Sequence, residues 1–200
     1  YPSGDQHNDS HIYDDLIDLN GDHRLDRVVS GPDAPYWQVY LGLPVSGGAA
    51  PHFAANPVTW ASPSKAIRRS EDDDDSVDVI DMNGDGLPDL VSGYWHVGQS
   101  APGSDRTGWI RIYYNDGSSF ASNPTLLRLP QELWNVASNG SNLDNTYKQW
   151  LRTRHQGELT MSLIDMNGDG LPDLVRELNG SRRIFLNLGN SFSPTADLGC

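Results

Sequence analysis

The side chains best suited to chemistry in this sequence are carboxylates and amides that recur three times with one spacing. Each of three segments carries Asp at its first, fifth and ninth positions and Asn at its third. Oxygens from alternate residues of a tightly curled loop point inward, and hard oxygen ligands of flexible number suit Ca²⁺. The seventh residue would add its backbone carbonyl. The predicted ligands are Asp18, Asn20, Asp22, Arg24 and Asp26; Asp81, Asn83, Asp85, Leu87 and Asp89; and Asp165, Asn167, Asp169, Leu171 and Asp173.

Other interpretations account for these segments less well. An EF-hand loop opens in a similar way but needs a bidentate Glu at its twelfth position, which here is Val29, Ser92 or Arg176. Asn-Gly hairpin turns with solvated Asp side chains need no metal, but such turns have no reason to recur three times with the same acids. No His or Cys occupies a ligand position, which argues against zinc and copper.

The three segments belong to an internal repeat, because two further elements follow each of them in the same order. The second elements begin at Trp37, Trp109 and Arg183, and the third elements begin at Phe53, Phe120 and Phe192. We therefore predict one domain over residues 1–200 that contains repeat units at about 13–61, 77–130 and 160–198.

Each repeat unit is expected to contain four short strands. In the first unit they are predicted at 13–19, 26–30, 36–41 and 57–61, where short runs alternate around aromatic and β-branched residues. Four-stranded units in a fixed order predict an all-β fold built from β-propeller blades, of which known propellers have about 4–8. Three units therefore predict part of a larger propeller, with diverged blades within 131–160 or association of chains as the alternatives. A first residue other than Met favours a processed product or a piece of something longer.

The segments between the units are long and polar. Residues 94–107 are rich in Gly, Ser and Pro and are predicted to form an inserted loop. A short helix is predicted around Thr146–Arg154. The acidic run Glu71–Asp75 is interpreted as a solvated loop in preference to an additional cation site.

The tryptophans divide into two groups. Trp37 and Trp109 are assigned to equivalent strand positions, where packing in the core is favoured over a binding role. Trp95 and His96 begin the inserted loop and are candidates for stacking on a sugar.

The pattern Asp-x-Asn-Gly-Asp-Gly-x-x-Asp between apolar strands resembles the FG-GAP/VCBS repeat. That resemblance implies blades of the integrin α-subunit type of β-propeller, with Ca²⁺ bound in the loop that joins two strands. The continuation to a Phe also resembles the propeller regions of bacterial Rhs-type proteins and insecticidal toxin-complex B components. It reads Tyr-Leu-Gly42, Tyr-Asn-Asp-Gly117 and Leu-Asn-Leu-Gly189. The first segment departs from the pattern with His23 at position six and Arg24-Leu25 after it, which implies a weaker first site.

Charge and composition exclude several classes of function. The formal net charge is −13, and binding of nucleic acid or an anionic membrane depends on clustered Lys and Arg. No apolar run approaches the ~20 residues of a membrane span. No Gly-x-Ser-x-Gly motif is present, and the single cysteine, Cys200, is terminal, so an enzyme is not predicted.

These expectations combine into one hypothesis. We expect a calcium-binding β-propeller module, holding three Ca²⁺ ions, that serves as a structural scaffold and protein-interaction surface. It would belong to a larger secreted or cell-surface protein of the Rhs or toxin-complex kind, whose other domains, or a separate protein, would be its partners. A carbohydrate-binding, lectin-like propeller is the first alternative. An enzyme with its active site on the propeller face is the second.

Overall fold

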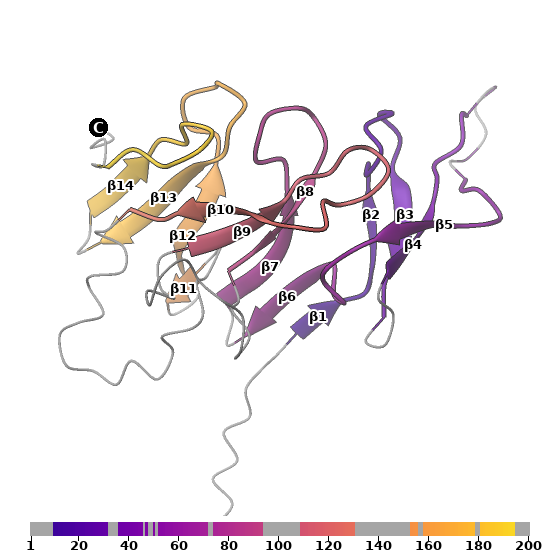
Figure 1. Ribbon diagram of the computed structural model, residues 1–200, viewed down its shortest axis with the longest axis horizontal. Coiled ribbons are helices and arrows are strands. Elements are labelled where there is room, and N and C mark those ends of the chain that lie inside the picture. Colours follow the sequence, from indigo (N-terminus) through magenta and orange to yellow (C-terminus); the bar gives the residue numbers. More distant parts are fainter. Residues whose placement is uncertain are drawn as a thin grey trace, which may run out of the picture.

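The computed structural model describes residues 10–31, 36–45, 47, 50, 52–71, 74–93, 109–130, 153–155, 158–178 and 181–194. Within these ranges the chain forms three antiparallel β-sheets and no helix, so the predicted all-β class is confirmed. The sheets stand side by side in a row (Figure 1). Among the same residues, no helix is long and apolar enough to cross a membrane. The row does not close into a ring, so the blade arrangement stays a prediction.

The first sheet contains four strands in chain order, and each coincides with a predicted strand to within two residues. Its strands alternate between the two faces, since Trp37 and Val39 are buried whereas Gln38 between them is exposed. The strands are β2 (Asp14–Ile17), β3 (Asp26–Val29), β4 (Tyr36–Tyr40) and β5 (Val58–Ala61).

The middle sheet has six strands and the third sheet has four, and consecutive strands of each repeat unit pair with one another. The middle sheet has the order β1 (Ser10–Ile12), β6 (Arg68–Glu71), β7 (Asp74–Ile80), β8 (Asp89–Ser92), β9 (Trp109–Tyr113) and β10 (Thr125–Arg128). The third sheet has the order β11 (Thr153–His155), β12 (Glu158–Ile164), β13 (Asp173–Leu178) and β14 (Ser181–Phe185).

Two segments that we interpreted as connections add strands to these sheets. Glu71 ends β6 and Asp74 begins β7, and the two residues face each other across the ladder. Glu71, Asp74 and Asp75 therefore belong to paired strands and not to a solvated loop, and residues 72–73 lie outside the described residues. Thr153 and Arg154 belong to β11, so the predicted helix is wrong for these two residues. The rest of that helix and the candidates Trp95 and His96 lie outside the described residues.

The first and middle sheets share one stretch of chain. Residues 10–12 pair with β6 in the middle sheet, and residues 14–17 pair with β3 in the first sheet. The change of partner occurs at Tyr13, whose carbonyl oxygen accepts a hydrogen bond from Ser30 N at 2.8 Å, while that of Ile12 accepts one from Ile67 N at 2.9 Å. This crossing fixes the two sheets relative to each other.

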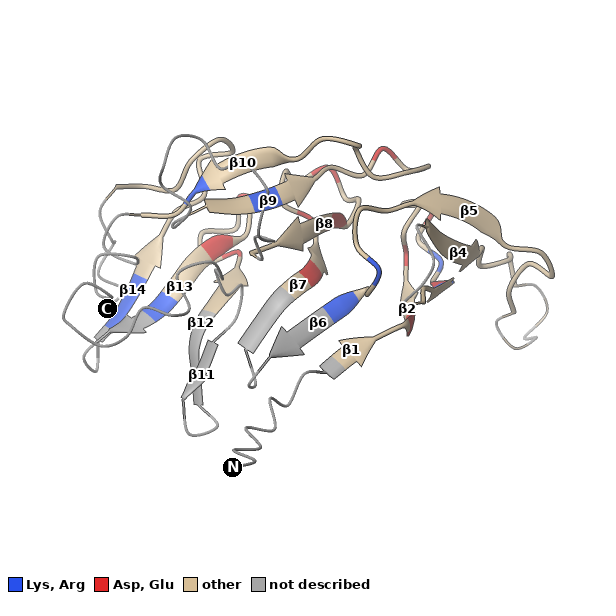
Figure 2. Cartoon of the chain, turned by 60° about the horizontal axis from the view of Figure 1, so that its bottom comes forward, with Lys and Arg blue, Asp and Glu red and all other residues tan. Residues whose placement is uncertain are grey.

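The middle sheet lies between the other two (Figure 1 and Figure 2), and its residues 77–79, 89–91 and 110–113 are buried on both faces. One hydrophobic cluster joins the first sheet to the middle sheet and includes Val28, Trp37, Leu90 and Phe120. A second cluster joins the opposite face of the middle sheet to the third sheet, with members such as Val91, Ile112, Leu174 and Phe185. The core is therefore two apolar layers between three sheets.

The ladder registers correct one predicted equivalence. Val28 pairs with Val39, and Val91 pairs with Ile112, so Trp37 corresponds in position to Ile110 and not to Trp109. Trp37 is fully buried and meets Phe120 edge to face, with ring centroids 5.1 Å apart. Trp109 is partly buried, and the guanidinium carbon of Arg128 lies 5.1 Å from its ring centroid. A slip of one residue along a strand reverses the face on which a side chain lies.

Candidate metal centres

The three Asp loops connect equivalent strands and lie together at one edge of the row, at the top of Figure 1. Each ladder closes in the same way, with Ile17 opposite Asp26, Ile80 opposite Asp89 and Ile164 opposite Asp173. Successive loops also touch. A Cβ added to Gly21 would lie 2.6 Å from the Cδ2 atom of Leu87, and one added to Gly84 would lie 3.3 Å from the carbonyl oxygen of Gly170.

The first Asp of each loop turns both carboxylate oxygens toward the backbone of its own loop. Asp18 Oδ1 accepts hydrogen bonds from Gly21 N at 2.9 Å and Asp22 N at 3.1 Å, and Asp18 Oδ2 accepts one from His23 N at 2.8 Å. Asp81 and Asp165 accept from the equivalent fourth and sixth residues: Gly84 N at 2.8 Å, Gly86 N at 2.8 Å, Gly168 N at 2.7 Å and Gly170 N at 3.0 Å.

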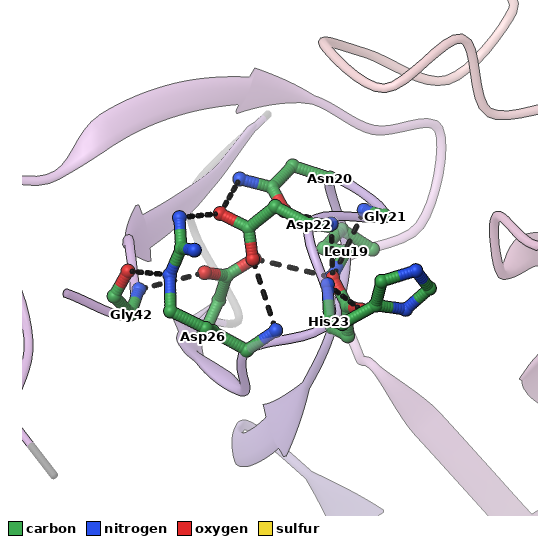
Figure 3. A network of polar contacts seen from close by, with 9 residues as sticks. Leu19, Asn20, Gly21, Asp22, His23, Asp26 and Gly42 are labelled. Atoms are coloured by element: carbon green, nitrogen blue, oxygen red, sulfur yellow. Dashed lines mark hydrogen bonds and ion pairs between the residues drawn. The ribbon is translucent and has the colours of Figure 1, made fainter. Parts of the chain in front are cut away.

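The third and fifth positions form a second shared unit. In the first loop, Asn20 Nδ2 donates to Asp22 Oδ2 at 3.1 Å, and Asp22 N donates to Asn20 Oδ1 at 3.0 Å (Figure 3). The pairs Asn83–Asp85 and Asn167–Asp169 make the same two bonds. The N–H of the seventh residue donates to the fifth-position carboxylate from Arg24, Leu87 and Leu171. The predicted use of the seventh carbonyl as a ligand stays a prediction.

The ninth-position aspartates, Asp26, Asp89 and Asp173, are fully buried and fasten the loops to the sheets. Each accepts one bond from the backbone N–H of the second loop residue and one from the backbone N–H of the second residue after the third strand of the repeat. For Asp89 these donors are Met82 N and Asn115 N, both at 2.9 Å. The corresponding donors are Leu19 N and Gly42 N for Asp26, and Met166 N and Asn187 N for Asp173.

Burial raises the pKa of Asp89 to about 6. The hydrogen bonds from Asn115 and Met82 oppose this rise, and the negative charges of Asp85 and Asp81 add to it. Burial raises the pKa of Asp26 as well, with added repulsion from the loop's two other carboxylates. The acids at positions one, five and nine are therefore close enough to repel one another. Nevertheless, no three His, Cys, Asp or Glu side chains converge as a metal-binding group within the described ranges.

The first loop differs from the other two at its sixth and seventh positions. Arg24 forms an ion pair with Asp22 at 2.5 Å, and its Nε atom donates to the carbonyl oxygen of Gly42 at 2.9 Å. A positive side chain thus lies against one predicted calcium ligand. His23 has φ of 65°, where the equivalent residues Gly86 and Gly170 have φ of 85° and 87°.

Replacement of His23 by Gly is expected to stabilise the protein. A side chain in the left-handed region is strained by roughly 1 kcal/mol, and the bond from the backbone N–H of residue 23 to Asp18 survives the change. The reverse change, Gly86→Ala, should destabilise by a similar amount, because a Cβ there meets no other atom within 4 Å and only the conformation is affected. Thermal melts check both variants, and a lower melting temperature for His23→Gly would contradict the expectation.

Two functional candidates were missed in the sequence, namely Asn115 and Asn187. Asn115 Nδ2 donates to the carbonyl oxygen of Leu19 in the neighbouring loop at 2.8 Å and to that of Pro88 at 3.2 Å. Asn187 Nδ2 donates to Met82 O at 3.4 Å and to Pro172 O at 3.2 Å. The signal available in the sequence was a spacing, because each Asn precedes a repeated Phe by five residues. In the structure each Asn forms an isolated β-bridge with that Phe.

Comparison with known proteins adds little to this geometry. No family model matches the chain, so the predicted FG-GAP/VCBS membership has no support from that source. No curated protein matches either. Among solved structures, a chain of the Photorhabdus luminescens Tc holotoxin pore is similar with a TM-score of 0.30 and 15% sequence identity. The match covers 92% of this chain and 12% of that one, so this chain spans a small part of its length.

Proposed function

We propose that the chain is a calcium-stabilised segment of a β-propeller, in which each Asp loop binds one Ca²⁺ ion and the stacked sheets act as a scaffold. The observation that carries this proposal is the common arrangement of acidic and amide oxygens in three loops that lie side by side. Hydrogen bonds from the loop backbone orient the carboxylates at positions one and five in every copy.

Electrostatics supplies the reason for a cation. Two loop carboxylates raise the pKa of the buried ninth-position acid in the first and second loops, in addition to the effect of burial. A bound cation would replace that repulsion by attraction. Because the carboxylates also accept backbone hydrogen bonds, the ion would draw together acids that the backbone has already turned toward the loop.

The donor atoms favour calcium over other common metals. The proposed ligands are carboxylate, amide and backbone oxygens, with no thiolate or imidazole among them. Ca²⁺ accepts six to eight such oxygens in flexible geometry, whereas Mg²⁺ demands near-ideal octahedral coordination. Of the three loops, the first would bind most weakly, since Arg24 already compensates Asp22.

The proposed role of the ion is to hold strand ends together. Position one follows the first strand of each unit, and position nine begins the next strand, so one ion would link both. Binding to the folded state alone then adds to stability by mass action. Modest affinity suffices where calcium is at millimolar levels, as outside cells. Together with the sequence resemblance, this supports a scaffold within a larger secreted or cell-surface protein.

Calcium is expected to raise the melting temperature, and EDTA should reverse the rise. At a calcium concentration one hundred times the dissociation constant, each site adds about 2.7 kcal/mol. For a domain of this size that corresponds to roughly 5–10 °C per filled site. Circular dichroism melts in EDTA, in Ca²⁺ and in Mg²⁺ measure the effect. Equal melting temperatures in EDTA and in millimolar Ca²⁺ would overturn the proposal, and an equal response to Mg²⁺ would overturn the choice of calcium.

A further inference from the structure

Neighbouring sheets contact each other in the same way at two places. The first sheet packs on the middle sheet through a face that contains Ile17, Val28 and Val39, all of them at most 9% exposed. By register, the equivalent residues of the middle sheet are Ile80, Val91 and Ile112, and these pack toward the third sheet. One face of each of the first two repeat units therefore covers the next unit in the row.

The third sheet presents this face again with Ile164, Val175 and Ile184, the equivalent residues by register. Here the face is less buried, because Ile164 is exposed and Val175 and Ile184 are only partly buried. Ile164 is 46% exposed, and Met166 beside it is 49% exposed. The residues equivalent to Met166 in the first two loops, Leu19 and Met82, are 0% and 1% exposed. We call the set Ile164, Met166, Val175 and Ile184 the terminal face.

A specific hydrogen bond accompanies each of the two buried interfaces. Asn115 of the middle sheet's repeat donates to the carbonyl oxygen of Leu19 in the preceding loop, and Asn187 of the third sheet's repeat donates to that of Met82. In the third loop the equivalent acceptor is the carbonyl oxygen of Met166. No side chain in the part of the chain that the structure describes donates to it. The terminal face therefore carries the apolar surface and the acceptor position of a repeat interface.

The opposite end of the row does not match the terminal face. The middle and third sheets face the preceding sheet with Leu90 and Leu174, which are at most 1% exposed. The equivalent residue of the first sheet is Arg27, which is exposed and forms an ion pair with Asp14 at 2.6 Å. In addition, Gly42 stands where the other repeats have the bridging Asn. A second copy of this chain would bring a charge and no Asn to the terminal face.

We propose that the terminal face is the docking surface for a further repeat sheet of the same kind as the middle and third sheets. The strands of that further sheet that face the terminal face carry an apolar residue equivalent to Leu90 and Leu174. The turn of that sheet carries an Asn that donates to the carbonyl oxygen of Met166. The partner is thus a β-sheet that offers these two groups to the terminal face. The inference rests on the propeller-segment part of the proposed function and is argued from the interfaces between sheets. It does not use calcium binding, so the calcium melts and the tests below can fail independently.

Charge substitutions in the full chain give the first test. Ile164→Lys with Met166→Lys should shift the melting temperature by less than about 2 °C, because the side chains are exposed. The matched change in the buried interface, Ile80→Lys with Met82→Lys, should lower it by more than about 10 °C, because two ammonium groups lose water. If the first pair is as damaging as the second, the terminal face is already covered within this chain and the proposal is wrong.

An extended chain gives the second test. Residues 131–200 are repeated after Cys200, and the added copy carries Met161→Leu and Met166→Leu so that the original Met166 is read separately. Peroxide converts Met to the sulfoxide, which mass spectrometry detects. Docking should slow oxidation of Met166 roughly tenfold, toward the rate of buried Met82, since oxidation then requires local opening. Asn187→Ala in the added copy should weaken this protection.

Two results would overturn the proposal. The first is an unchanged rate of Met166 oxidation in an extended chain whose circular dichroism shows the added β-structure. The second is a dimer of the original chain, seen by sedimentation, that dissociates on Met166→Lys and protects Met166. In that case the occupant is a second copy and not a further repeat sheet.

Discussion

Replacing both Asp81 and Asp165 by Ala is expected to remove most of the stabilisation that calcium confers. These are the first acids of the two loops that lack an arginine, and each loop would lose two of the oxygens assigned to the ion. With the first loop intact, the rise in melting temperature between EDTA and saturating Ca²⁺ should fall to about a third of the original rise. The stabilisation that remains is about 2.7 kcal/mol if that loop fills. Melts of both proteins in both buffers measure this difference.

A matched control comes from an aspartate that lies outside the three Asp loops. Asp116 accepts hydrogen bonds from Ser118 N, Ser118 Oγ and Ser119 N at 2.7–2.9 Å, much as the first loop acids accept from their own backbone. These bonds, led by that of the Ser118 hydroxyl, hold the pKa of Asp116 below its ordinary value. Asp116→Ala should lower stability in EDTA and leave the calcium response unchanged. An equal loss of response in this control would mean that calcium acts by general screening of charge.

The strands that carry the sites could be predicted from sequence because side-chain burial dictates their pattern. Val28, Trp37 and Val39 alternate with exposed residues, and that alternation is visible without a structure. Strand β6 (Arg68–Glu71) and strand β11 (Thr153–His155) contain no apolar residue, so they leave no periodic signal. Their pairing is made by backbone N–H and C=O groups, which every sequence possesses.

The residues of the candidate sites also differ in whether the sequence alone reveals them. The loop acids could be identified from spacing, because the oxygens of one loop come from residues close together in the chain. The contact between Asn115 and Leu19 joins residues 96 positions apart, and only the stacking of sheets brings them together. The mistaken equivalence of Trp37 and Trp109 arose because residue type was aligned in place of ladder register, where one position reverses the face.

Replacing Asn115 by Ala is expected to cause a large loss of stability. Asn115 is 3% exposed, and its Nδ2 atom donates hydrogen bonds to the carbonyl oxygens of Leu19 and Pro88. Its Oδ1 atom also accepts a hydrogen bond from Gly117 N at 2.9 Å. Alanine would leave these groups without partners, at a combined cost of about 3 kcal/mol. The melting temperature should fall by about 6–12 °C.

Two further asparagines show whether that loss belongs to the bond between sheets. Asn187→Ala should cost less, because the distance from Asn187 Nδ2 to Met82 O is 3.4 Å, against 2.8 Å for the bond to Leu19 O. Asn190, exposed in the following turn, should be replaceable by Ala within about 0.5 kcal/mol. The calcium response of Asn115→Ala should persist, because no proposed ligand oxygen is removed. If Asn115→Ala melts no lower than Asn190→Ala, the side-chain bonds of Asn115 do not hold the first and middle sheets together.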